Sequence, residues 1–230
     1  MKSAAVLLLC CSFAASAAPS EIKAEYQLTN NGIVIGRVQE SFVRKEDDTY
    51  SISSVSRSEG ILKLLYDETI TLQSSGRVVA KGLQPLRFEE RRMRDPRRDV
   101  EATFDWDSGQ FESHFRGETS TLPLPRDTVD RLTMMYQFMY FKPRAGSFVF
   151  AMSNGRKVER YMYRFVDEVR IATPLGEFDT FHLERVVDTP KDNRAEVWLA
   201  KERDNFPVRV VFDDPKGLRI EQSIVALQSR

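Results

Sequence analysis

Cysteine and histidine are scarce in this 230-residue sequence, which contains two of each. Cys10 and Cys11 are adjacent and close to the N-terminus, whereas His114 and His182 are far apart along the chain. Zinc sites usually combine three or four His, Cys or acidic ligands. We therefore expect no metal site, and no other cofactor is predicted.

An excess of charge of one sign is also missing, because 34 Lys and Arg residues are balanced by 34 Asp and Glu residues. A dedicated nucleic-acid-binding domain normally carries a strong positive charge, so we expect no nucleic-acid partner. Beyond the N-terminus, the best apolar run is residues 134–141, and Gln137 interrupts it. A membrane-spanning helix needs about 20 apolar residues, so the sequence predicts no transmembrane span.

Motifs of nucleophilic or nucleotide chemistry are absent, since the sequence lacks G-x-S-x-G, a P-loop and a dinucleotide-binding fingerprint. His182 and Glu184 project from one face of a predicted strand, a spacing shared by acid–base pairs and by ordinary neighbours. We interpret this pair as structural. The sequence therefore predicts a protein that is not an enzyme.

The first 17 residues have the three parts of a secretory signal peptide. Lys2 supplies a short positive region, residues 4–13 an apolar stretch, and Ala15-Ser16-Ala17 the small residues of a cleavage site. We predict cleavage after Ala17, because Pro19 would hinder a cut one residue later. The exported chain, residues 18–230, would then contain no thiol and no disulfide. The predicted location is the periplasm.

A lipid anchor on one of the two cysteines is the alternative for this segment. The residue before an acylated cysteine should be small, but Leu9 precedes Cys10 and Cys10 precedes Cys11. We therefore favour cleavage and a soluble product.

Residues 18–230 are expected to form a single β-rich domain, because apolar and polar residues alternate between turns rich in Gly, Asn, Asp and Pro. Asn30-Asn31-Gly32 is typical of a tight hairpin turn. We expect about ten to twelve strands, with residues 64–73 among them and a turn at Ser74-Ser75-Gly76. Open sheets of this size rarely stay flat. The predicted fold class is mainly β, with one many-stranded antiparallel curved sheet or open barrel wrapped around one central helix.

The central helix is predicted over residues 128–141, with Asp127 as its N-cap and Lys142-Pro143 after its end. Apolar side chains cover nearly every side of this segment. A helix that is apolar all round is buried all round. We therefore place it inside the curve of the sheet.

Methionine and aromatic residues dominate this helix and a nearby strand. They are either packed core or, because flexible thioethers adapt to irregular ligands, the lining of an apolar binding site. The candidate ligand-binding residues are Met134, Met135, Phe138 and Met139 on the helix and Tyr161 and Tyr163 on the strand.

Arginine is concentrated in residues 87–98, where acidic residues are interspersed. Such a segment is usually a solvated surface whose charges pair with one another. The functional alternative is contact with an anionic partner or lipid headgroup, because guanidinium groups match phosphate and carboxylate. The candidate contact residues are Arg91, Arg92, Arg94, Arg97 and Arg98.

Several short motifs resemble those of a known family. They are Ser74-Ser75-Gly76-Arg77, Gly82-Leu83-Gln84-Pro85, Phe104-Asp105-Trp106, Asp130-Arg131-Leu132, Thr173-Pro174-Leu175-Gly176-Glu177-Phe178, Trp198-Leu199-Ala200 and Phe206-Pro207-Val208-Arg209. Together with the signal peptide, they resemble an uncharacterised family of proteobacterial exported proteins, a domain of unknown function. More loosely, the expected architecture is similar to the periplasmic lipoprotein-carrier superfamily, whose open barrels hold lipid chains.

Two functions remain open on the sequence. The first is a non-enzymatic periplasmic binding or carrier protein for an apolar ligand or a lipidated partner, held between the helix and the concave sheet. The second is a cell-envelope interaction or assembly factor with a solid core, which would act on another envelope protein through its surface.

Overall fold

The computed structural model describes residues 19–143 and 146–230. The predicted signal peptide and its cleavage site after Ala17 lie outside the described residues. Within the described ranges, no helix combines the length and apolar composition needed to cross a membrane.

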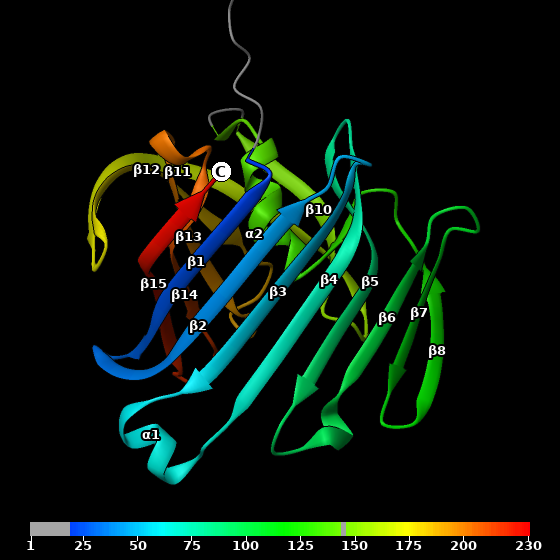
Figure 1. The fold of residues 1–230 in the computed structure, drawn as a ribbon, viewed down its shortest axis with the longest axis horizontal. Helices are drawn as coiled ribbons and strands as arrows, with labels where there is room; N and C mark the ends of the chain where they lie inside the picture. Colours follow the sequence, from blue (N-terminus) through cyan, green and yellow to red (C-terminus); the bar gives the residue numbers. More distant parts are fainter. Residues whose placement is uncertain (1–18, 144–145) are drawn as a thin grey trace, which may run out of the picture.

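The described residues form one curved sheet of fifteen strands (Figure 1), and the predicted fold class is confirmed. Neighbouring strands pair antiparallel, except β9 and β10, which are parallel. The strands are β1 Glu21–Asn30, β2 Ile33–Arg44, β3 Thr49–Ser58, β4 Thr69–Val79, β5 Gly82–Arg92, β6 Val100–Asp105, β7 Gln110–Phe115, β8 Glu118–Pro123, β9 Thr128–Asp130, β10 Ser147–Ser153, β11 Val158–Thr173, β12 Gly176–Val186, β13 Arg194–Ala200, β14 Phe206–Asp213 and β15 Arg219–Ser229.

The strand order explains the curvature. The order begins at β8, passes through the central β1–β15 pair and ends at β9, so two strands that follow each other in sequence form opposite edges. A flat sheet of this size would be roughly 65 Å wide, whereas the connection between the two edges, residues 124–127, can reach only about 17 Å. The sheet therefore has to curl back on itself. β8 and β9 do not pair, so the barrel is open.

The expected number of strands was too low, and the expected boundaries near residue 64 were wrong. Residues 60–65 form the short helix α1 (Gly60–Leu65), and β4 continues through Ser74 to Val79. Gly76 is not in a turn, because it pairs with Pro85 in β5, where the carbonyl oxygen of Gln84 approaches closely. Strand β8 was not predicted, because most of its side chains are exposed and polar and therefore show no apolar–polar alternation.

The predicted helix over residues 128–141 is shorter than expected. Thr128–Asp130 is β9, the α-helical part is α2 (Thr133–Gln137), and one 3-10 turn, η2 (Phe138–Tyr140), follows. Asp127 does not cap it. Instead, a carboxylate oxygen of Asp130 accepts hydrogen bonds from the backbone N–H groups of Leu132 at 2.9 Å and Thr133 at 2.8 Å.

The predicted burial of the helix is confirmed, because α2 lies inside the curve of the sheet (Figure 1). Its Tyr136 ring is fully buried, 5.2 Å from the ring of Phe42 on β2 and 5.8 Å from that of Phe206 on β14. The helix thus joins strands from both halves of the sheet into one core.

Candidate functional site

An apolar pocket of about 480 Å³ lies beside β9, one of the two edge strands of the curved sheet. The β4–β5 turn and the end of β6 form one side, and β9, β10 and the end of the α2 segment form the other. Its lining residues are Val79, Ala80, Lys81, Leu83, Gln84, Trp106, Arg126, Asp127, Thr128, Val129, Gln137, Phe141, Val149 and Phe150. The pocket is therefore formed by segments that are distant in sequence.

Two polar side chains in the wall of this pocket, those of Gln137 and Trp106, are already hydrogen-bonded to the protein. The amide of Gln137 accepts from the backbone N–H of Leu83 at 2.7 Å and donates to the carbonyl of Lys81 at 2.9 Å. The indole N–H of Trp106 donates to the carbonyl of Pro85 at 2.7 Å. Because these groups are satisfied, the wall they leave facing the pocket is mainly apolar, as in most small-molecule sites.

Charged side chains lie around the same pocket. Asp127 pairs with Arg160 at 3.1 Å. Lys81 and Arg126 are both exposed, and neither forms an ion pair with another residue that the structure describes. These two cations could meet the anionic end of an otherwise apolar ligand.

The six predicted ligand-binding residues gather around α2 and β11 but do not line this pocket. Met134, Phe138 and Tyr163 are buried in one core cluster, where the Phe138 and Tyr163 rings are 5.6 Å apart. Met135 and Met139 pack on the core, and Met139 borders a separate small hollow of about 70 Å³. Tyr161 is half-buried beneath the guanidinium of Arg185.

Sequence reasoning missed Gln137 and Phe141, which do line the pocket. A signal existed for Gln137, since it is the one polar residue that interrupts the apolar run of residues 134–141. A buried polar side chain in such a run needs partners, and here the partners come from the β4–β5 turn.

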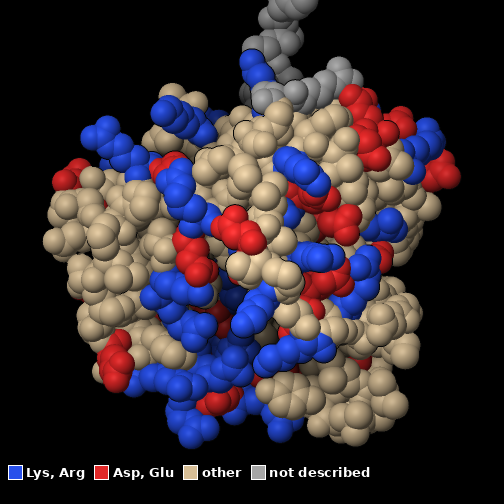
Figure 2. All heavy atoms as spheres, turned by 180° about the vertical axis from the view of Figure 1, so that it is seen from behind, with Lys and Arg blue, Asp and Glu red and all other residues tan. Residues whose placement is uncertain are grey.

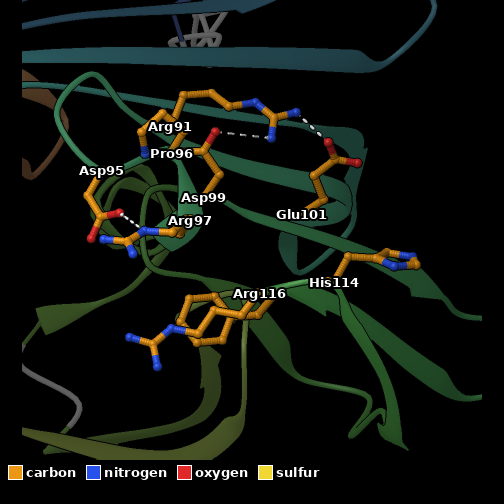
Figure 3. Close-up of a pocket in the computed structure, with 10 residues that line it drawn as sticks. Arg91, Asp95, Pro96, Arg97, Asp99, Glu101, His114 and Arg116 are labelled. Atoms are coloured by element: carbon orange, nitrogen blue, oxygen red, sulfur yellow. Dashed lines mark hydrogen bonds and ion pairs between the residues drawn. The ribbon is translucent and has the colours of Figure 1, made fainter.

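A second, more polar hollow of about 780 Å³ lies between the loop after β5 and the β7–β8 turn (Figure 3). The loop contains the 3-10 turn η1 (Pro96–Arg98). Of the five predicted contact arginines, Arg91 and Arg97 line this hollow, and Arg116, which sequence reasoning missed, lies across from them. Arg92 instead pairs with the buried Glu90 at 2.6 Å.

Ion pairs neutralise part of the basic segment. Arg91 hydrogen-bonds to Glu101 and lies 3.7 Å from Asp99, and the hydrogen bond to Glu101 raises the pKa of Arg91. Arg97 pairs with Asp95 at 2.9 Å and lowers the pKa of that carboxyl group.

Three other arginines, two in the basic segment and one across the hollow, lack such acidic partners among the described residues. Arg94, Arg98 and Arg116 form no ion pair within the described part of the chain. The self-paired interpretation therefore holds for Arg91, Arg92 and Arg97, and Arg94 and Arg98 remain candidates for contact with a partner.

Carboxylates, arginines and one histidine supply the titratable groups of the polar hollow. The residues lining the polar hollow include no Ser, Thr, Cys or Lys that could serve as a nucleophile. His182 stacks on Trp198 and contacts Asp167 at 3.3 Å and Glu196 at 2.8 Å, whereas Glu184 pairs with Arg164. No group of three His, Cys, Asp or Glu side chains that could hold a metal ion occurs among the described residues.

The sequence of this chain matches a family model over residues 23–223, and the model is described as a protein of unknown function, DUF3108. The chain belongs to the DUF3108 family. The resemblance to a domain of unknown function is thereby confirmed. No curated protein matches the chain.

Solved structures include a β-barrel-like protein of the domain of unknown function DUF1849 from Brucella abortus. It has a TM-score of 0.63 and 13% identity, and the match covers 93% of this chain and 99% of that one. This likeness shows that this chain and that DUF1849 protein share a fold.

Two further similarities are weaker. A provisionally assigned lipoprotein from Parabacteroides distasonis has a TM-score of 0.36 and 10% identity, covering 92% of this chain and 96% of its own. A provisionally assigned outer membrane lipoprotein-sorting domain from Vibrio parahaemolyticus has a TM-score of 0.29 and 9% identity, covering 92% and 86%. Scores this low carry no information about function.

Proposed function

We propose that this protein is a non-enzymatic binding or carrier protein of the cell envelope, which holds the apolar chain of a lipid or of a lipidated partner. The observation that carries the proposal is the pocket beside β9, whose wall is mainly apolar and in which Gln137 and Trp106 already have hydrogen-bond partners within the protein. The pocket's volume of about 480 Å³ falls in the range of roughly 300–1,000 Å³ that ligand sites occupy.

The ligand we propose has an apolar chain and an anionic end. The apolar chain would lie against Leu83, Val129 and Phe150, which are largely buried already and need little reorganisation to receive it. Lys81 and Arg126 would contact the anionic end. The candidate residues on α2, η2 and β11 would then shape the site by packing in the core behind its wall; they are Met134, Met135, Phe138, Met139, Tyr161 and Tyr163.

Export to the envelope is part of the same proposal and rests on the signal-peptide pattern of residues 1–17. The processed chain, residues 18–230, would be a single domain in the periplasm. N-terminal sequencing of protein isolated from the periplasmic fraction should begin at Ala18.

Displacement of a fluorescent fatty-acid probe tests the binding proposal. Val149 on β10 is half-exposed and lines the pocket, so Val149→Asp places a charge against the apolar chain while leaving the core unchanged. We expect about a tenfold or greater loss of affinity for the probe. Leu175→Asp is the matched control, because Leu175 has a similar exposure in the β11–β12 turn, away from the pocket.

The control should bind the probe like the wild type, and both variants should keep the wild-type melting temperature. A delipidated wild-type protein that never binds the probe would overturn the proposal. The alternative, an envelope interaction or assembly factor that acts through its surface, would then be the better description.

A further inference from the structure

Helix α1 presents apolar side chains to solvent instead of to the core. Its sequence is Gly-Ile-Leu-Lys-Leu-Leu, and none of its residues is buried. The exposed fractions are 64% for Ile61, 86% for Leu64 and 76% for Leu65. A short helix normally covers its apolar side with the rest of the protein, so contiguous exposure of this kind marks a surface that binds something.

Two neighbouring loops extend this apolar surface. Ile33 and Val34 at the start of β2 are exposed, and the N–H of Glu59, just before α1, donates to the carbonyl of Ile35 at 2.9 Å. Met93, after β5, is also exposed, and its N–H donates to Thr69 at 3.0 Å. The β1–β2 turn, α1 and the loop after β5 thus lie at one end of the sheet, at the bottom of Figure 1. We call this end the α1 tip.

Cations border the α1 tip. Lys63 lies within the helix, and the guanidinium of Arg94 stacks 4.4 Å above the ring of Tyr66, which follows the helix. Arg97 and Arg98 lie in η1, on the same loop as Arg94. Figure 2 shows Lys and Arg side chains gathered over the lower part of the rear face, beside uncharged surface.

Nearby carboxylates only partly offset these cations. Glu59 pairs with Arg37 at 3.1 Å, and Asp95 pairs with Arg97 at 2.9 Å. Glu68 is buried and accepts hydrogen bonds from the backbone N–H groups of Thr69 and Arg94. Asp67 remains as an exposed acidic residue. Lys63, Arg94 and Arg98 have no ion pair with a described residue, so the tip combines apolar side chains with available positive charge.

We propose that the α1 tip docks on the surface of a membrane that contains anionic lipid. Ile61, Leu64 and Leu65 would enter the boundary between headgroups and acyl chains, and Lys63, Arg94 and Arg98 would contact the lipid phosphates. Interfacial helices bind membranes by this combination of a small apolar face and flanking cations. Tyr66 is suited to the headgroup level, because its ring is apolar and its hydroxyl group is polar.

A membrane fits this surface better than a protein does. In a symmetric dimer the tip would face its own copy, so Arg94 and Arg98 would meet like charges. A six-residue helix and two neighbouring loops also offer little area compared with the roughly 800 Å² per partner of a stable protein interface. A narrow, projecting apolar element can insert between lipids without a matching groove.

The proposal is independent of the apolar pocket. β4 begins next to α1 at Thr69 and ends at Val79 in the pocket wall, so the two sites lie about 30 Å apart along the strand. Variants at one site can therefore be assayed for the function of the other.

Co-sedimentation with vesicles tests the docking proposal. We expect wild-type protein to bind vesicles of mixed phosphatidylcholine and phosphatidylglycerol, and to bind pure phosphatidylcholine about tenfold more weakly. The double substitution Leu64→Ser and Leu65→Ser should reduce binding at least tenfold, since each leucine loses its apolar contact with lipid. Arg94→Gln with Arg98→Gln should abolish the preference for anionic vesicles and its sensitivity to salt.

Matched controls remove the same groups elsewhere. Leu175→Ser with Val166→Ser replaces two exposed apolar side chains on β11 and in the β11–β12 turn, and Lys45→Gln with Arg77→Gln removes two exposed cations at the far end of the sheet. Both controls should bind vesicles like the wild type, and the tip variants should keep wild-type affinity for the fatty-acid probe. Absence of wild-type binding to anionic vesicles, unchanged binding by the leucine variant, or a dimer that depends on Leu64 and Leu65 would overturn the proposal.

Discussion

The phenol of Tyr136 on α2 donates a hydrogen bond of 3.2 Å to the carboxyl group of Glu40 on β2. Ser54 on β3 donates to the other oxygen of the same group, also at 3.2 Å. Glu40 is buried, and its burial raises the pKa of the carboxyl group to about 7, against the lowering effect of the two hydrogen bonds. The central helix is therefore attached to the sheet by a group that can change its charge near neutral pH.

This attachment predicts a pH-dependent stability. The pKa of Glu40 is about 7 in the folded chain and about 4.5 when the chain is unfolded, so between these values the folded state binds more protons. The contribution of Glu40 to the free energy of unfolding is therefore complete below about pH 4.5 and is lost as the pH rises through 7, a difference of roughly 3 kcal/mol.

Glu40→Gln isolates this effect, because an amide keeps the shape of the group but does not titrate. Urea unfolding at pH 5 and pH 8 should show a smaller loss of stability with rising pH in Glu40→Gln than in the wild type. Glu118→Gln, at an exposed position on β8, should leave the wild-type profile unchanged. Identical profiles for wild type and Glu40→Gln would contradict the prediction.

Asp130 should be important for stability, because it lies between β9 and α2 in a fully buried position. In addition to its two backbone hydrogen bonds, it accepts hydrogen bonds from the hydroxyl groups of Ser74 at 2.6 Å and Thr133 at 2.7 Å. Asp130→Ala would leave buried donors without a partner, at about 1–3 kcal/mol for each one. We expect a loss of at least about 3 kcal/mol in the free energy of unfolding.

Asp130→Asn is the matched control for that measurement. Its side-chain oxygen can still accept from the backbone N–H groups, and its amide can donate to the hydroxyl groups. It should cost clearly less than Asp130→Ala in chemical denaturation. Equal losses would show that the carboxylate charge, and not the hydrogen-bond geometry, is what the site requires.

Gly76 should tolerate no side chain, although it lies within a strand. A Cβ atom there would be 2.1 Å from the carbonyl oxygen of Gln84 and 2.8 Å from the Cα of Pro85. Backbone atoms cannot move aside easily, so Gly76→Ala should cost roughly 1–3 kcal/mol or more, as overpacking does. Thermal unfolding measures this loss. Gly109→Ala is the comparison, because the added methyl group there would meet no other atom. Its loss of stability should come only from the positive φ of the backbone, which alanine adopts less readily than glycine.

The local pattern of residues in the sequence was enough to predict the hairpin turn, the curved sheet and the buried helix. Asn31 and Gly32 both have positive φ, at 48° and 80°, as the predicted hairpin turn requires. The alternation of apolar residues predicted a curved antiparallel sheet, and the apolar coverage of residues 128–141 predicted a buried helix, which the structure contains over a shorter range. These features depend on residues within a few positions of one another.

Only the tertiary structure decided where the candidate sites are. Gln137 meets Lys81 and Leu83 because the curled sheet brings together segments more than fifty positions apart, and that meeting forms the wall of the apolar pocket. The sequence predicted residues 64 and 65 as part of a strand. In the structure they lie in α1, outside the sheet, where their apolar side chains are exposed to solvent. Pocket and tip both arise from long-range pairing and curvature, and no local pattern of residues encodes the distance between two strands that are far apart in the chain.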